Sequence, residues 1–301
     1  MKHKSGKHSP IFYAFLFPAL FSFAFVIVIP FFLGIYYSFT DWTAMTGTNV
    51  NWVGFANYTA VFNDVTFLHS FLVTVAFAVI NIVVVNVVAF GFALLVTSKL
   101  KLKNMYRAAF FMPNLIGGII LGYIWQFIFN NAITAFGASI GSEFLATSLL
   151  ANRFWALLAI VVVVTWQNAG YIMMIYVAAI QSAPAALLEA AHIDGANYWQ
   201  RLRHILVPLV APAFTVSLFL TLVRSFQQFD VNMALTAGGP SGMFMDRALP
   251  TTEFLALNIF NTAFAFRELA QGQAKSVIFF ITLTVIALVQ VYFNKRKEIE
   301  M

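Results

Sequence analysis

Six long stretches of this 301-residue sequence contain almost no Asp, Glu, Lys or Arg, and these stretches constrain its fold more than any other feature. An apolar helix of about 20 residues crosses the roughly 30 Å hydrocarbon core of a bilayer. Only 9% of all residues are charged, whereas a soluble domain is about a quarter charged. We therefore predict an all-α fold, a polytopic membrane helix bundle. Its six transmembrane helices are placed near residues 11–39, 68–98, 107–130, 155–180, 205–232 and 276–294.

The composition excludes several other classes of protein. With 61% apolar residues and 35 Phe, the chain has far more apolar surface than a disordered protein can leave in water. The absence of Cys rules out disulfides, thiolate metal sites and cysteine nucleophiles. The net charge is +6, but the long uncharged runs leave no room for the concentrated basic face of a nucleic-acid-binding protein.

The distribution of Lys and Arg predicts the orientation in the membrane. If the N-terminus is cytoplasmic, twelve of the seventeen basic residues fall on the cytoplasmic side, four fall outside and Arg224 lies within a span. Cytoplasmic loops carry the excess of Lys and Arg in membrane proteins. Both termini are therefore predicted to be cytoplasmic, with an N-terminal tail at 1–10, a transmembrane domain at 11–294 and a C-terminal tail at 295–301.

The predicted cytoplasmic loop 182–204, between spans four and five, has an unusual local pattern. Pro184 suits the first turn of a helix, Ala185 to Ala191 are strong helix formers, and Gly195 can turn the chain. The pattern indicates a helix, a bend and a second short helix. Pro208 and Pro212 then favour a change of direction at the start of span five. The second helix is predicted to carry one apolar stripe, formed by Tyr198, Leu202 and Ile205.

The order of residues through this loop is Glu189-Ala190-Ala191, then Asp194-Gly195-Ala196, then Ile205, Pro208 and Pro212. It resembles the EAA loop of the permease subunits of binding-protein-dependent ABC importers, with Leu202 where that loop often has Phe. The resemblance implies the type I ABC importer permease fold. It also implies that the loop couples the permease to an ATPase through Glu189, Ala190, Ala191, Asp194, Gly195, Ile205 and Pro208.

Shorter matches along nearly the whole chain are similar to the sugar-transporting branch of that family, which serves di- and oligosaccharides and glycerol phosphate. They are Phe17-Pro18-Ala19, Tyr37 to Trp42, Trp125, Trp166, Leu235 to Pro240 and Gly272 to Ser276. The resemblance implies four kinds of partner: membrane lipid, a second permease subunit in a heterodimer, two cytoplasmic ATPase subunits, and an extracellular or periplasmic sugar-binding protein. It places the chain in the plasma membrane of a bacterium.

Enzymatic chemistry is not expected in this chain. The only Gly-Lys pair, Gly6-Lys7, lacks the spacing of a phosphate-binding loop, and the five His residues show no metal-ligand spacing. We therefore predict no cofactor and no metal site here, and expect a partner subunit to bind ATP and Mg²⁺ and to hydrolyse the ATP.

Polar side chains in the middle of predicted spans indicate where a solute could pass. Gln167, Asn168 and Tyr171 fall within one 100° sector of span four and combine amides with an aromatic ring, which suits a sugar. Alternatively, such groups only bond to neighbouring helices. Arg224 could hold a substrate or snorkel to the outer interface, and snorkelling is favoured. The predicted substrate-pathway residues are Trp166, Gln167, Asn168, Tyr171, Gln227, Asp230 and Asn86.

These observations together predict the permease subunit of an ATP-driven sugar importer that works by alternating access. Two alternatives stay open. One is an importer of the same kind for amino acids, peptides or anions. The other is an ATPase-independent channel, which would have no use for the element from Glu189 to Pro208.

Overall fold

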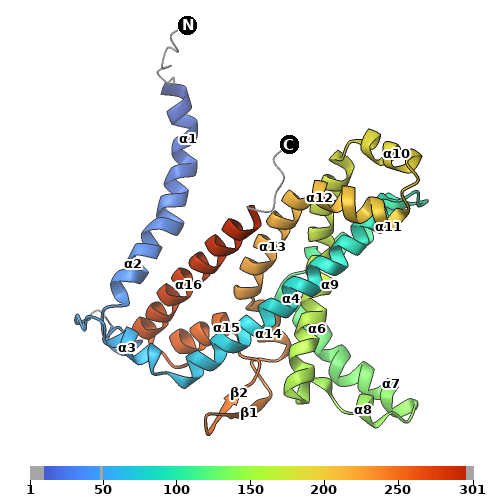
Figure 1. Ribbon diagram of the computed structural model, residues 1–301. Coiled ribbons are helices and arrows are strands. Elements are labelled where there is room, and N and C mark those ends of the chain that lie inside the picture. Colours follow the sequence, from blue (N-terminus) through green and yellow to red (C-terminus); the bar gives the residue numbers. More distant parts are fainter. Residues whose placement is uncertain (1–9, 48–49, 296–301) are drawn as a thin grey trace. The chain divides into compact units, whose positions relative to one another are not determined.

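The structure of the protein is a computed structural model that describes residues 10–47 and 50–295 (Figure 1). Most of the two predicted tails, residues 1–9 and 296–301, lies outside the described residues. The chain divides into two compact units, one made of residues 1–63 and 259–279 and the other of residues 64–258 and 280–301. The described residues are mainly helical, as the sequence predicts, with one short β-hairpin.

The first unit is built from apolar and amphipathic helices. It contains α1 (Pro10–Phe23), a π-helical turn (Ala24–Val28), α2 (Ile29–Tyr37), α3 (Ala56–Phe62), a second π-helical turn (Asn261–Ala265) and the first part of α16 (Leu269–Lys295).

The second unit contains the longest helices of the chain. Its elements are α4 (Val65–Thr97), α5 (Lys103–Phe111), a 3₁₀ turn (Met112–Leu115), α6 (Gly118–Phe127), a π-helical turn (Ile128–Ala132), α7 (Ile133–Ser139), α8 (Glu143–Ala146), a 3₁₀ turn (Leu149–Ala151), α9 (Arg153–Ser182), α10 (Ala185–Ile193), α11 (Tyr198–Arg201), a π-helical turn (Leu202–Leu206), α12 (Val207–Leu209), α13 (Ala211–Phe226), α14 (Asp230–Leu235), β1 (Ser241–Phe244), β2 (Arg247–Pro250), and α15 (Leu255–Phe260), which ends in the first unit.

Five helices among the described residues are long and apolar enough to cross a membrane, and a sixth span results if one bent pair is counted as a single span. The five are Phe12–Tyr37, Val65–Thr97, Gly118–Ser139, Arg153–Ser182 and Leu269–Asn294. Helix starts follow local chemistry: the Asp64 side chain accepts a hydrogen bond from the Thr66 amide at the start of α4, and Asn152 does the same for α9.

The third predicted span begins in the wrong place. The sequence predicts one helix near 107–130, but the chain forms α5 and a 3₁₀ turn, becomes extended at Ile116 and Gly117, and starts a new helix at Gly118. The helix that can cross a membrane runs from Gly118 to Ser139. Pro113, within the 3₁₀ turn, lacks an amide hydrogen and so cannot continue the helical hydrogen-bond pattern.

The fifth predicted span, near 205–232, is also not one straight helix. It bends by 69° between Tyr198–Leu209 and Ala211–Phe226, and the second piece ends at Phe226, before the short α14. The bend falls at Val210, between Pro208 and Pro212. The predicted change of direction is therefore confirmed, while the predicted single span to residue 232 is wrong.

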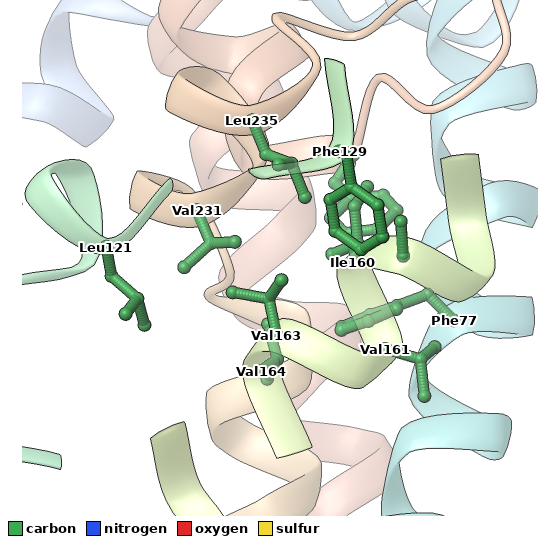
Figure 2. Packing of buried hydrophobic residues seen from close by; sticks show 11 residues of the cluster. Phe77, Leu121, Phe129, Ile160, Val161, Val163, Val164, Val231 and Leu235 are labelled. Carbon is green, nitrogen blue, oxygen red and sulfur yellow. The ribbon is translucent and has the colours of Figure 1, made fainter. Parts of the chain in front are cut away.

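The second unit has its core where α4 packs along α9 and α13 packs along α4. One buried cluster joins Phe77 of α4 to Ile160 and Val164 of α9 and to Val231 and Leu235 of α14 (Figure 2). A second cluster along the same two helices surrounds Tyr176. In Figure 1, the β-hairpin and the α10–α11 segment lie at opposite ends of this unit.

The loop between α2 and α3 contains several side-chain hydrogen bonds. The Asp41 carboxylate accepts a hydrogen bond from the Asn51 amide nitrogen at 2.7 Å and another from Asn51 Nδ2 at 2.9 Å. Asn57 Nδ2 donates to the carbonyls of Ser38 and Thr40. The Asn51 side-chain bond is the main cause that holds the pKa of the Asp41 carboxyl below its ordinary value.

Candidate functional site

A cavity of about 370 Å³ lies within the second unit, where helices break or end. It is bounded by the break before α6, by the middle of α9, and by the junction of α13 with α14. Its wall is formed almost entirely by polar side chains. The lining residues are Asn114, Gly118, Gln167, Asn168, Arg224, Gln227, Gln228, Phe229 and Asp230.

Two amides from the middle of α9 form one wall of this cavity. Gln167 Nε2 donates to the Ile116 carbonyl at 3.1 Å, in the extended segment that interrupts the third run. Asn168 Nδ2 donates to the Val164 carbonyl of its own helix at 3.0 Å, and this bond leaves its Oδ1 as an acceptor. The sequence predicts that both residues face a cavity, and both line it. Their contact with a substrate stays a prediction.

Arg224 turns inward to these residues. Its Nη1 donates to Asn168 Oδ1 at 2.7 Å, and its guanidinium carbon lies 4.4 Å from the centroid of the Tyr171 ring. Snorkelling, which the sequence favours, is therefore wrong for Arg224. An amide oxygen and an aromatic face within reach compensate for the lost hydration of the cation, and neither partner can be read from the sequence of α13 alone.

A second part of the wall comes from the α13–α14 junction. Gln227 and Asp230, both predicted from the sequence, line the cavity there. Asp230 sits directly over Gly118 of α6, where a Cβ atom added to the glycine would come within 2.6 Å of the Asp230 Cβ. Gly118 is therefore required for α14 to approach α6 this closely.

Five lining residues are not among the predicted pathway residues: Asn114, Gly118, Arg224, Gln228 and Phe229. Asn114 is a polar interruption of the third apolar run, the same signal that identifies Gln167 and Asn168 in the fourth. Gln228 follows the predicted Gln227 directly. Gly118 and Phe229 also line the cavity, but neither has a polar side chain, so a search for polar residues in apolar runs does not find them.

Three predicted pathway residues lie outside the lining set. Trp166 is 44% exposed and packs edge-on against Trp125, with 5.6 Å between ring centroids. Tyr171 takes part indirectly, through its contact with Arg224. Asn86 lies in a buried network, where it accepts a hydrogen bond from the Tyr176 hydroxyl at 2.8 Å.

That buried network links three helices of the second unit. Asn86 Nδ2 of α4 donates to Thr221 Oγ1 of α13 at 3.2 Å, and the Tyr176 hydroxyl of α9 is hydrogen-bonded to Ser217 Oγ of α13 at 2.5 Å. Ser225 lies one helical turn after Thr221 on α13, and its Oγ accepts a hydrogen bond from Asn81 Nδ2 of α4 at 2.8 Å. Of the two alternatives that the sequence leaves open for Asn86, the structure therefore shows the one in which its side chain bonds to neighbouring helices.

The predicted coupling loop forms the expected helix, bend and helix. Helix α10 ends at Ile193, and Gly195 has φ of +83°, which L-residues other than glycine rarely adopt. Helix α11 starts with a reciprocal cap between Asn197 and Gln200. Glu189 is exposed on α10. A hollow of about 430 Å³ lies at the bend, lined by Asp194, Gly195, Ala196, Gln200, His204 and Ile205.

The apolar stripe of the second short helix differs from the prediction. Leu202 is buried as expected, but Tyr198 is 54% exposed and Ile205 is half-buried. The buried stripe is Leu202, Leu206 and Val210, spaced by four residues. The π-helical turn 202–206 and the bend at Val210 rotate the buried face relative to that of a straight helix.

These features define a class. A set of apolar helices that lines a polar cavity and exposes a helix–bend–helix element is built as a membrane transport subunit. Within the described residues, no group of three or more His, Cys, Asp or Glu could hold a metal ion. Residues 88–299 match the family described as binding-protein-dependent transport system inner membrane component, and the chain belongs to this family. It is a multi-pass membrane protein of the permease kind, and such subunits are not themselves catalytic.

Relatives match along most or all of the chain. It is 44% identical over 302 residues, 100% of this chain and 99% of the relative, to the probable starch degradation products transport system permease protein AmyD of Thermoanaerobacterium thermosulfurigenes. It is 30% identical to the multiple sugar-binding transport system permease protein MsmF of Streptococcus mutans, with 90% of each covered. It is also 30% identical to the sn-glycerol-3-phosphate transport system permease protein UgpA of Agrobacterium fabrum, with 83% of each covered.

Solved structures show the same fold. A chain of a bacterial ABC transporter involved in the import of the acidic polysaccharide alginate aligns with a TM-score of 0.79 at 19% identity, over 95% of each chain. A bacterial alginate ABC transporter in complex with an alginate pentasaccharide-bound periplasmic protein aligns with a TM-score of 0.74 at 20% identity, over 94% of this chain and 92% of that chain. The fold is that of a type I ABC importer permease.

Proposed function

We propose that this chain is the transmembrane permease subunit of an ATP-driven importer of uncharged di- or oligosaccharides. The observation that carries the proposal is the polar cavity, whose wall offers the amides of Asn114, Gln167 and Asn168 at the level of the middle of α9. Amides donate and accept hydrogen bonds at once, as hydroxyl groups do. The starch and multiple-sugar relatives support a saccharide as the cargo.

In this proposal the chain works by alternating access within a larger complex in a bacterial plasma membrane. Its partners are a second permease subunit, two cytoplasmic ATPase subunits that bind Mg²⁺ and hydrolyse ATP, and an extracellular or periplasmic sugar-binding protein. Both termini and α10–α11 face the cytoplasm, where exposed Glu189 and the bend at Gly195 contact the ATPase. The alginate complex, which includes a periplasmic protein, supports the presence of a binding protein.

The test compares two asparagines that make the same local bond. Asn168 Nδ2 and Asn131 Nδ2 each donate to the carbonyl four residues earlier, but only Asn168 lines the cavity. In the reconstituted complex, N168A is expected to weaken sugar binding by about 0.5–3 kcal/mol, since one hydrogen-bonding group is lost from the wall. N131A should leave binding unchanged.

Uptake of a radiolabelled maltodextrin, basal ATPase rate and melting temperature are measured together. Reduced uptake in N168A at an unchanged melting temperature and basal ATPase rate supports the proposal. Equal uptake by N168A and N131A would remove the cavity from the transport path. Uptake by the wild-type protein without ATP would instead favour a channel.

A further inference from the structure

The cavity in the second unit holds two charges of opposite sign that do not pair with each other. Of its nine lining residues only Arg224 and Asp230 are charged. Arg224 is held by Asn168 Oδ1 and by the Tyr171 ring. Across the described residues, no ion pair within 4.0 Å joins the guanidinium to the Asp230 carboxylate, and no hydrogen bond occupies that carboxylate.

Each charge retains unused hydrogen-bonding capacity. A guanidinium has five N–H donors, and among the described residues the only acceptor for Arg224 is Asn168 Oδ1. The Asp230 carboxylate offers acceptors only. The side chain of Asp230 is exposed to the cavity and its Cβ is fixed against Gly118. The wall therefore presents donors on α13 and acceptors on α14 to whatever fills the cavity.

The consequence for a ligand depends on its charge. An uncharged polyol can accept from the guanidinium and donate to the carboxylate through different hydroxyl groups. An anion gains attraction from Arg224 but meets repulsion from Asp230 in the same space. Inside a membrane protein, where the surrounding medium has a low dielectric constant, such a repulsion is screened far less than at an open surface.

We propose that Asp230 is a charge filter that makes this cavity select uncharged saccharides over anionic ones. The inference rests on the proposed function and adds a specificity-determining residue to it. Together with Arg224, Asp230 brings the formal charge of the lining to zero. Removing the carboxylate leaves a net positive wall that accepts acidic sugars.

The experiment uses the purified transporter complex with its ATPase subunits, without binding protein, so that only the membrane cavity selects the ligand. A non-hydrolysable ATP analogue is present, and isothermal titration calorimetry measures the affinity for maltotriose and for maltotrionate, its aldonic acid. The two probes share two intact glucose rings, and maltotrionate differs by its carboxylate and by the open chain at its reducing end, which is the same for every variant compared. The wild-type complex is expected to bind maltotrionate at least about tenfold more weakly, which corresponds to one unfavourable charge contact at a few ångströms in a partly hydrated site.

The variant D230N keeps the size of the side chain and removes its charge. It is expected to bind the two probes within about twofold of each other, and its maltotriose binding reports that the site is folded. D246N is the matched control, because Asp246 is exposed on the β-hairpin turn and lies outside the lining. D246N should keep the wild-type ratio of the two affinities, the Kd for maltotrionate divided by the Kd for maltotriose. R224Q, which leaves the carboxylate alone in the cavity, should raise the ratio above the wild-type value.

The outcomes separate the filter from the function. Maltotriose binding with the wild-type ratio retained in D230N overturns the filter while the proposed cargo stands, and so does equal binding of both probes to the wild-type complex. Failure of the wild-type complex to bind maltotriose even after the sugar-binding protein is added overturns the proposed cargo, and the filter with it. D230N could also lose maltotriose binding altogether. In that case the filter is overturned if the Kd for maltotrionate divided by the Kd for maltotriose in R224Q is at or below the wild-type value.

Discussion

Gly170 on α9 has the least room for a side chain among the glycines that the structure describes. A Cβ atom added there would lie 1.9 Å from the Phe110 carbonyl oxygen and 2.8 Å from the Phe111 Cα. Ordinary van der Waals contact begins at 3.4 Å, so α9 and α5 would have to separate by about 1.5 Å. The obstructing atoms belong to the backbone, which cannot swing aside as a flexible side chain would. The strain must therefore move whole helices.

The variant G170A is expected to destabilise the protein by about 1–3 kcal/mol or more, which is the usual cost of overpacking a close-packed site. Gly91 on α4 is the matched control, since nothing lies within 4 Å of a Cβ built there. G91A should be neutral or stabilising by up to about 1 kcal/mol, because alanine favours a helix over glycine. Gly170 is two residues from Asn168, so a shift of α9 should also weaken sugar binding.

Thermal melting of the detergent-solubilised complex and maltotriose titration provide the two readouts. A lower melting temperature for G170A than for the wild type and G91A is expected. If G170A has the same melting temperature as the wild type and binds sugar normally, α9 does not pack against α5 as described and the reasoning fails. A loss of stability in G91A of the same size would show that any added methyl group is harmful in these helices.

Two further predictions concern the bend of the coupling loop and the loop after α2. G195V places a β-branched residue at φ of +83° and should abolish sugar-stimulated ATPase activity with the subunits still inserted, whereas G141V, at φ of +69° in another loop, should not. Wild-type stimulation in G195V would refute coupling at the bend. The Asp41–Asn51 tether depends on a carboxyl of lowered pKa, so it is complete above the ordinary pKa of 3.8 and is lost as the pH falls through the lower folded-state pKa. The protection factor of the Asn51 backbone amide, its exchange rate relative to the intrinsic rate at the same pH, should therefore fall only in acid in the wild type, but already at neutral pH in D41A. Equal protection factors at neutral pH would contradict the tether.

The apolar runs predict the helices well but not where they break. A span is recognised from the absence of charge, and the ends of α4 and α9 fall within a few residues of the prediction because capping residues stand there. The break at Ile116 and Gly117 occurs inside an uncharged run, so charge carries no signal for it. The hairpin after α14 was missed for another reason: its turn places Met245 and Asp246 at positive φ without the glycines that usually mark such a turn.

The cavity was partly predictable because buried amides are costly and must face either a partner or water. That argument singles out the amides of Gln167 and Asn168 in α9 and of Gln227 beyond the end of α13, all of which line the cavity, but it also singles out Asn86, which does not. It cannot place Arg224, whose inward position depends on an acceptor and a ring that another helix provides.

Asn86 and Asn168 show why the sequence of a single span cannot separate a structural amide from a cavity amide. Each lies mid-helix, and each donates Nδ2 to the carbonyl four residues earlier, at 2.7 Å and 3.0 Å. They differ in the groups that lie opposite them. Thr221 of α13 and the Tyr176 hydroxyl of α9 hold Asn86 in a buried network, whereas Arg224, nearly one turn beyond Thr221, meets Asn168 at the cavity with a cation that needs polar surroundings. The side chains of neighbouring helices, which the sequence of one span does not show, thus determine which amide is sealed and which is left at the cavity.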